Sequence, residues 1–172
     1  MTDISRPGGP ASASGGGDGP ARAHRILAFA LLSAPVYILV AVWFAAPPAE
    51  EDLPTWVAAG AIALVALGWL LAQTVGFRAA PLAFGDDRAL ALQRYQSLAL
   101  LRFVVTEVPV IAGVAAAFAL PYGPWPYVVV LVVGLPSMVL QVWPSRRVVD
   151  RVATRLESSG VPSGLREAFG HR

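Results

Sequence analysis

Residues 98–120 read LALLRFVVTEVPVIAGVAAAFAL, an apolar stretch that only Arg102 and Glu107 interrupt with charge. A helix needs about 20 apolar residues to cross the hydrocarbon core of a bilayer, so this stretch predicts a transmembrane helix. Pro109 does not argue against it, because membrane helices tolerate proline where neighbouring helices satisfy the freed carbonyl. Glu107 is the residue that invites a chemical hypothesis, because a carboxylate inside a membrane is costly.

Three other stretches have the same character, at residues 26–46, 55–77 and 125–143, and none of them contains a charged residue. The whole chain is 56% hydrophobic and 14% charged, with a mean hydropathy of +0.60. A soluble domain has about a quarter of its residues charged. The sequence therefore predicts an all-α fold, an integral membrane bundle of four transmembrane helices.

The arginines predict how this bundle is oriented. All 13 basic residues are arginine, which is typical of a GC-rich bacterial genome, and they avoid the first and third connections between spans. By the positive-inside rule, the N-terminus, the middle connection and the C-terminus are cytoplasmic. We expect a multi-pass protein of the bacterial plasma membrane. The arginines that carry this prediction are Arg6, Arg22, Arg25, Arg78, Arg88, Arg94, Arg102, Arg146, Arg147, Arg151, Arg155, Arg166 and Arg172.

The chain divides into three parts by composition. Residues 1–21, rich in Gly, Ser, Pro and Ala, predict a disordered cytoplasmic tail. Residues 22–144 form the four-span domain, and residues 145–172 form a cytoplasmic tail. A cleaved signal peptide ending near Ala46 is the alternative for the first span, although its apolar run is longer than a typical signal core.

Polar side chains recur at one depth in three spans. Gln73, Glu107 and Gln141 each lie five residues inside an arginine, which is about 7 Å along a helix. Buried polar groups in lipid tend to face the bundle interior and to pair, so we expect Glu107 to hydrogen-bond to Gln73 or Gln141. Two interpretations stay open. The layer fixes helix register, with Arg102 compensating the carboxylate, or Glu107 titrates in a proton or ion path.

Pro109 adds to the second interpretation. A proline there cannot donate to the carbonyl of Val105, which leaves a free acceptor within a turn of Glu107. A cation site would use such an oxygen, although an ordinary helix kink explains the proline as well.

Small residues at a spacing of four mark the expected helix contacts, because close approach is what drives association in lipid. We expect the second and third spans to pack together, although an alanine-rich chain also produces such spacings by chance. The residues concerned are Gly68, Ala72 and Gly76 in the second span, and Gly113 and Ala117 in the third.

The predicted cytoplasmic segments contain two helix signals. Asp86 and Asp87 follow a glycine and predict a cap for a helix over residues 88–96 that runs into the third span. Residues 145–157 place valines and Leu156 on one helical face and arginines on the other. We expect this amphipathic helix to lie on the inner leaflet with its arginines near anionic headgroups, docking to a partner being the alternative.

The second and third spans resemble the proteolipid subunit c of rotary ATP synthases. The resemblance rests on a membrane glutamate followed by isoleucine, glycine and alanine, and on a small-residue first helix followed by arginine and proline. It implies that Glu107 is a proton-carrying carboxylate. The chain has one more span on each side of this hairpin than that family has. The matching residues are Gly68, Ala72, Gly76, Arg78, Pro81, Glu107, Ile111, Gly113 and Ala117.

Few residues are left to support other chemistry. The chain has no cysteine, and its two histidines, His24 and His171, stand alone near charged termini, where we expect them to be solvated. We therefore expect no catalytic residues, no metal, no cofactor and no nucleic-acid partner. The sequence favours a non-enzymatic accessory or structural subunit of a membrane assembly, in a homo-oligomer or larger complex. An ion-translocating component using Glu107 is the alternative.

Overall fold

The computed structural model describes residues 19–170, which form helices and their connections without any strand. Four helices are long and apolar enough to cross a membrane, so the predicted all-α membrane bundle is confirmed. The elements are α1 (Gly19–Ala45), α2 (Thr55–Thr74), α3 (Arg88–Ala119), α4 (Trp125–Val142), α5 (Arg146–Leu156), the 3₁₀ turn η1 (Glu157–Ser159) and α6 (Leu165–Ala168).

The helix ends differ from the apolar stretches in informative ways. Helix α1 begins at Gly19, so residues 19–21 of the expected tail are helical, and residues 1–18 lie outside the described residues. Helix α3 has 32 residues, about 48 Å, which exceeds a hydrocarbon core of about 30 Å. The Asp87 carboxylate accepts a hydrogen bond from the Leu90 amide at 2.8 Å and so caps α3, as predicted.

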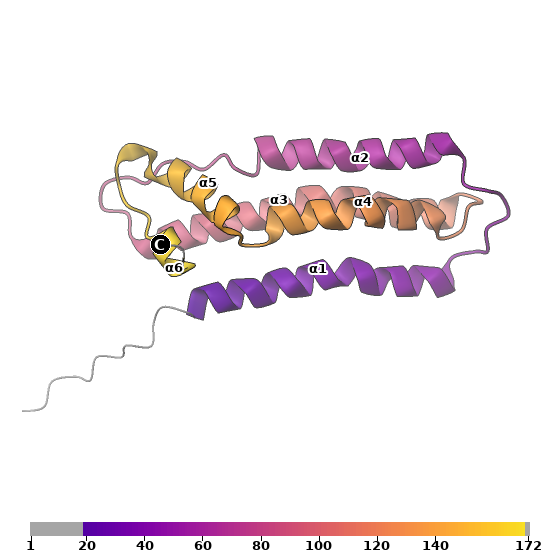
Figure 1. The fold of residues 1–172 in the computed structure, drawn as a ribbon, viewed down its shortest axis with the longest axis horizontal. Helices are drawn as coiled ribbons and strands as arrows, with labels where there is room; N and C mark the ends of the chain where they lie inside the picture. The colour runs from indigo at the N-terminus through magenta and orange to yellow at the C-terminus, as the bar shows by residue number, and fades with distance from the viewer. Residues whose placement is uncertain (1–18, 171–172) are drawn as a thin grey trace, which may run out of the picture.

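Helices α3 and α4 form the central pair of the bundle, and α1 and α2 pack on opposite sides of this pair (Figure 1). Helix α2 contacts both members of the pair, whereas α1 contacts chiefly α4. The core between them, which we call the bundle core, contains Val65, Phe103, Val110, Tyr127 and Met138 among others. Large apolar side chains point outward from α1 and α2, as expected of surfaces that meet lipid.

Glycine contacts test the predicted packing of α2 on α3. A Cβ atom on Gly68 would lie 3.1 Å from Pro109 Cγ, and one on Gly76 would lie 2.2 Å from Arg102 Cγ. Both glycines therefore face α3, as expected. Gly113 does not face α2 as expected, because its nearest neighbours are Val130 and Tyr127 of α4. Ala72 and Ala117 are fully buried.

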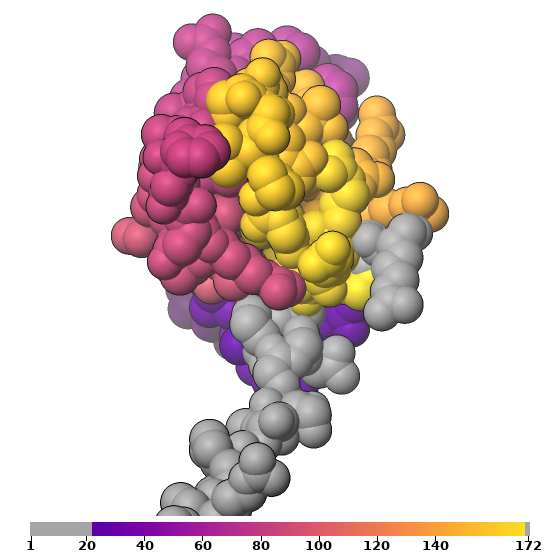
Figure 2. Space-filling model, turned by 90° about the vertical axis from the view of Figure 1, so that its left-hand side faces the viewer, coloured from indigo at the N-terminus to yellow at the C-terminus, as the bar shows by residue number. Residues whose placement is uncertain are grey.

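A second core lies at the arginine-rich end of the bundle, and we call this part of the molecule the cap. It combines the second connection, the first part of α3, α5 and α6. Figure 2 looks onto it: the C-terminal segments (yellow) lie beside the second connection and the start of α3 (magenta). The Leu82 amide donates to the Leu156 carbonyl oxygen at 2.9 Å, which ties the connection to α5.

The cap corrects the prediction for the amphipathic helix. The apolar face of α5, which includes Val149, Val152 and Leu156, is buried against the cap core. Its partner is the chain itself, so this face is not available to the inner leaflet.

The opposite end is closed by contact between the first and third connections. The amides of Glu50 and Glu51 donate to the carbonyl oxygen of Pro121 at 2.9 and 3.2 Å. Gly123 has a φ of 58°, and a Cβ atom there would lie 3.0 Å from the Pro47 carbonyl oxygen. The two connections that lack arginine thus lie at one end, and we call it the acidic-loop end.

Candidate functional site

Arg102 is fully buried where the bundle meets the cap. Its Nε donates to the Gln141 carbonyl oxygen at 3.0 Å, and its Nη1 donates to the Gly76 carbonyl oxygen at 2.9 Å. The guanidinium carbon lies 4.5 Å from the centre of the Phe77 ring, within the range of a cation–π contact. Arg102 of α3 therefore contacts two other segments, the end of α4 and the turn that follows α2, and we call this set of contacts the Arg102 junction.

The two acceptors explain why an arginine is there. The last carbonyls of a helix have no intrahelical donor, and the C-terminal end of the helix dipole attracts a cation. Gln141 lies in the last turn of α4, and Gly76 lies just beyond the end of α2. Arg102 therefore caps two helix ends at once from the middle of α3. The missing side chain at Gly76 is what gives Arg102 room.

The two glutamines do not form the expected layer with Glu107. The Gln73 amide oxygen accepts a hydrogen bond from Arg151 of α5, and the Arg151 guanidinium carbon lies 4.2 Å from the centre of the Phe77 ring. The Gln141 side chain is buried, and neither its nitrogen nor its oxygen has a partner among the described residues. The structure thus brings Arg102 and Gln141 together only through the Gln141 backbone.

Glu107 is half-buried on α3 and makes no side-chain hydrogen bond or ion pair within residues 19–170. The expected compensation by Arg102 is therefore not found, because Arg102 binds backbone carbonyls instead. Thr106 and Thr74, the other expected members of the layer, donate to carbonyls of their own helices. A buried polar group is expected to have a hydrogen-bond partner, but the expectation does not identify that partner. Here the partners of Arg102, Thr74 and Thr106 are backbone carbonyls.

The carbonyl freed by Pro109 is also accounted for. A Cβ atom on Gly68 would lie 3.2 Å from the Val105 carbonyl oxygen. That oxygen therefore faces the α2 backbone at its closest approach to α3, where weak C–H···O contacts are common. It is part of the helix contact and does not point toward a site at Glu107.

His24 corrects the expectation of a solvated histidine, because only 6% of its surface is exposed. Its ring centre lies 5.2 Å from that of Tyr95 in α3 and 5.9 Å from that of Phe169 next to α6. Neither ring nitrogen has a hydrogen-bond partner among the described residues. No sequence signal connects these three residues, because they are far apart in the chain. His171 lies outside the described residues.

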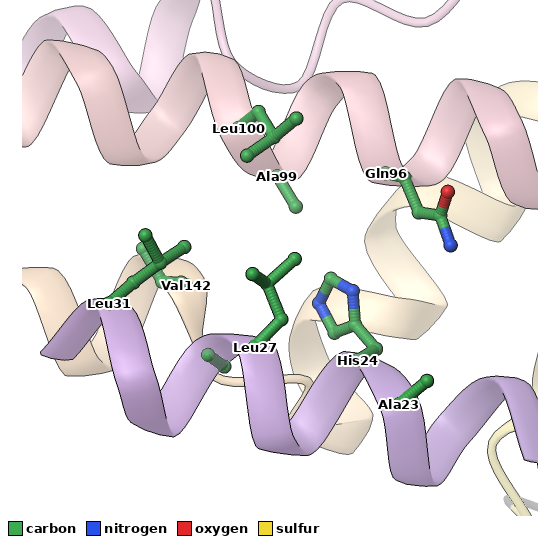
Figure 3. Close-up of a pocket in the computed structure, with 9 residues that line it drawn as sticks. Ala23, His24, Leu27, Leu31, Gln96, Ala99, Leu100 and Val142 are labelled. Carbon is green, nitrogen blue, oxygen red and sulfur yellow. The ribbon is translucent and has the colours of Figure 1, made fainter.

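A cavity of about 170 Å³ lies beside His24, between α1 and α3, and we call it the His24 cavity. In Figure 3, His24 and Leu27 point from α1 toward Ala99, and the Gln96 amide points back toward α1. The lining is apolar apart from His24 and Gln96. An apolar hollow with a few convergent polar groups is the usual form of a small-molecule site.

The edge of the cap carries the ion pairs of the aqueous end. Arg166 contacts Glu157 at 2.5 Å and Asp150 at 3.1 Å, and Ser163 donates to Glu157 at 2.6 Å. Burial raises the pKa of the Glu157 carboxyl, but the hydrogen bonds from Ser163 and Arg166 outweigh it and hold this pKa below its usual value. The hydrogen bond to Glu157 raises the pKa of Arg166 in turn.

Within residues 19–170, no group of three or more His, Cys, Asp or Glu side chains has the arrangement of a metal site. Comparison with protein families, with curated proteins and with solved structures finds no match to this chain. Three features of the described residues could support a function: the Arg102 junction, the isolated Glu107 and the His24 cavity.

Proposed function

We propose that the protein is a non-enzymatic accessory or structural subunit of a larger assembly in the bacterial plasma membrane. The observation that carries this proposal is the cap, a folded aqueous unit attached to the bundle through the Arg102 junction. The cap packs the second connection, the start of α3, α5 and α6 into one unit, which presents a fixed surface to the aqueous phase. The arrangement suits a role in binding other proteins.

The charge distribution supports both the orientation and the use of the cap. Arg147 and Arg155 lie exposed on α5, and neither has a carboxylate partner among the described residues. The first and third connections, which contain only acidic charges, lie together at the other end. With the arginine-rich end cytoplasmic, the cap faces the cytoplasm and offers its cations to an acidic partner surface or to anionic lipid.

A charge-reversal experiment tests this role. Native membranes containing wild-type protein are solubilised gently, and the size of the complex is measured by native electrophoresis. The variant Arg147→Glu/Arg155→Glu is expected to migrate at the size of the protein alone. The matched control Glu50→Lys/Glu51→Lys reverses two charges at the acidic-loop end and is expected to keep the larger size. Identical migration of all three proteins contradicts the proposal.

Glu107 supports a second candidate, an ion- or proton-translocating component. A carboxylate inside a span, with no hydrogen-bond or ion-pair partner among the described residues, is what a carrier that titrates requires. The resemblance of the α2–α3 hairpin to subunit c also depends on this residue. That family lacks helices corresponding to α1 and α4. Even with these two helices present, Glu107 is only half-buried on α3.

Proteoliposomes distinguish the two candidates. Flux driven by a pH gradient is compared for wild-type protein and Glu107→Gln, with carbodiimide labelling of Glu107 as a function of pH. A carrier loses its flux in the variant and is labelled above pH 7, because carbodiimides react with protonated carboxyls. An accessory subunit shows the same background flux in both proteins, and Glu107→Gln leaves the larger complex intact.

A further inference from the structure

The His24 cavity contains an imidazole whose hydrogen-bonding capacity is unused. Both ring nitrogens are buried, and neither has a partner among the described residues. Burying a polar group without a hydrogen bond destabilises the folded protein. The group concerned here is the His24 imidazole, which lines the cavity.

The imidazole is also held in one place. Tyr95 and Phe169 contact its ring, and their own rings lie 4.9 Å apart, so α3 and the C-terminal segment fix it from two sides. A side chain clamped in this way cannot easily turn to reach water outside the protein. A hydrogen-bond partner for His24 therefore has to be a molecule that enters the cavity.

The lining of the cavity describes that partner. Leu27, Leu31, Leu100 and Val142 provide apolar walls, while His24 and Gln96 are the polar groups. An occupant that fits therefore has a hydrocarbon part and an oxygen that accepts a hydrogen bond from the imidazole. At about 170 Å³ the cavity holds only a part of a large molecule, such as one end of an acyl chain with its ester.

The surrounding charges select among such molecules. Arg22 and Arg25 flank His24 in the first turns of α1, and both are exposed without a carboxylate partner among the described residues. Both belong to the start of α1, which lies at the end of the bundle next to the cap (Figure 1), where we expect the lipid headgroups. A phosphate there meets arginine, while the ester and acyl chain below it meet His24 and Leu27.

We propose that the His24 cavity is a specific binding site for an anionic phospholipid. The ester carbonyl accepts a hydrogen bond from His24, the start of one acyl chain occupies the space between α1 and α3, and Arg22 and Arg25 bind the phosphate. Helix α1 packs chiefly on α4 and only lightly on α3, so the lipid completes the contact between α1 and α3. The site does not depend on the protein being a subunit of an assembly.

Native mass spectrometry of the full chain, released from nanodiscs that contain phosphatidylglycerol and phosphatidylcholine, tests the site. Wild-type protein is expected to retain one phosphatidylglycerol molecule. His24→Phe keeps an aromatic ring against Tyr95 and Phe169 but removes the donor, and Leu27→Trp fills the cavity while keeping His24. Each is expected to lower the affinity for phosphatidylglycerol at least tenfold. Leu27→Trp keeps the test decisive if His24→Phe does not fold.

The control is Phe29→Trp, at a side chain of α1 that is 69% exposed and is not among the residues that line this cavity. It is expected to retain the lipid as wild type does. Equal retention by all four proteins, or no retained lipid in wild type, overturns the proposal. So does displacement of phosphatidylglycerol by a neutral carbonyl compound with an apolar chain, such as decylubiquinone, because the phosphate would then have no part in recognition.

Discussion

The bundle core and the cap core are built from the same chain by opposite means. The cap buries valine, leucine and phenylalanine side chains, and it places its ion pairs at the edge, on Arg166, Asp150 and Glu157. The bundle buries Arg102, Thr106 and Gln141 in addition to its apolar core, and it leaves many of its largest apolar side chains on the outside. The contrast follows from the solvent. Water drives apolar groups together, whereas lipid does not, so the bundle depends on close packing and hydrogen bonds.

Helix α3 belongs to both cores, because Ala91 and Tyr95 lie in the cap core while Phe103 and Val110 lie in the bundle core. Arg102 lies just where one core gives way to the other. Substitutions in the two regions separate their contributions, and the largest effect is expected at Arg102, which joins them.

Replacement of Arg102 by methionine is expected to destabilise both regions. Hydrogen bonds to charged groups contribute about 1.5 to 3 kcal/mol each, and two are lost, so we expect a loss of about 4 kcal/mol in the free energy of unfolding. Unfolding by SDS in mixed micelles measures this loss. The control Arg155→Met removes an exposed arginine and is expected to change stability by less than about 0.5 kcal/mol. Equal effects of the two substitutions would show that Arg102 does not join the regions.

Leu156→Ala and Met138→Ala compare the cores directly, because both side chains are fully buried, one in the cap and one in the bundle. We expect Leu156→Ala to cost about 3 kcal/mol and to raise hydrogen exchange in α5 and α6 while α4 stays protected. Met138→Ala is expected to cost about half as much, because its side chain stays in lipid when the bundle separates. Hydrogen exchange with mass spectrometry resolves the two regions. A larger loss for Met138→Ala would contradict the comparison.

Gly76→Ala tests the space that Arg102 needs. The new Cβ atom would lie 2.2 Å from Arg102 Cγ and 2.6 Å from the Ala72 carbonyl oxygen, so one of them has to move. Overpacking of this kind costs about 2 kcal/mol. Gly60→Ala, inside α2, is the control, because nothing lies within 4 Å of its Cβ position. It is expected to be neutral or to gain up to about 1 kcal/mol from helix propensity. Thermal unfolding in nanodiscs measures both.

Acid is expected to weaken the cap before the bundle. The folded-state pKa of Glu157 lies below its unfolded value, which is about 4.3. Its contribution to stability is therefore complete above that value, and it is lost as the pH falls through the folded-state pKa. The raised pKa of Arg166 has no effect in this range, because arginine stays protonated. Hydrogen exchange of α6 should rise in wild type as the pH falls through the folded-state pKa of Glu157, and Glu157→Gln should remove this dependence.

Hydropathy predicts the four spans because the length of an apolar run is a local property, and α4 matches its predicted bounds to within one residue. The cap could not be predicted in the same way. The stripe of Val149, Val152 and Leu156 specifies an apolar partner, but it does not distinguish lipid from the start of α3. The sequence predicts a solvated His24, since it does not reveal the contacts with Tyr95 and Phe169. These contacts form only when distant parts of the chain come together in the fold.

The polar residues show a second limit. The spacing predicts one depth for Gln73, Glu107 and Gln141, but depth does not fix the direction in which a side chain points, and Arg102 rather than Glu107 reaches Gln141. The acceptors of Arg102 are backbone carbonyls of Gly76 and Gln141, and a carbonyl has no signature in the sequence. Gly76 is the indirect signal, because a glycine at the end of a helix opposite a membrane arginine indicates a close approach.

The order of the cap segments along the chain has a consequence for biosynthesis. The second connection and the start of α3 are made well before α5 and α6, which follow the last membrane helix. Until residues 146–169 have left the ribosome, Leu82, Ala91 and Tyr95 have no covering partner and face the aqueous phase. A nascent or truncated chain thus displays an apolar surface that chaperones and membrane proteases recognise, and arrival of the last two helices removes that signal.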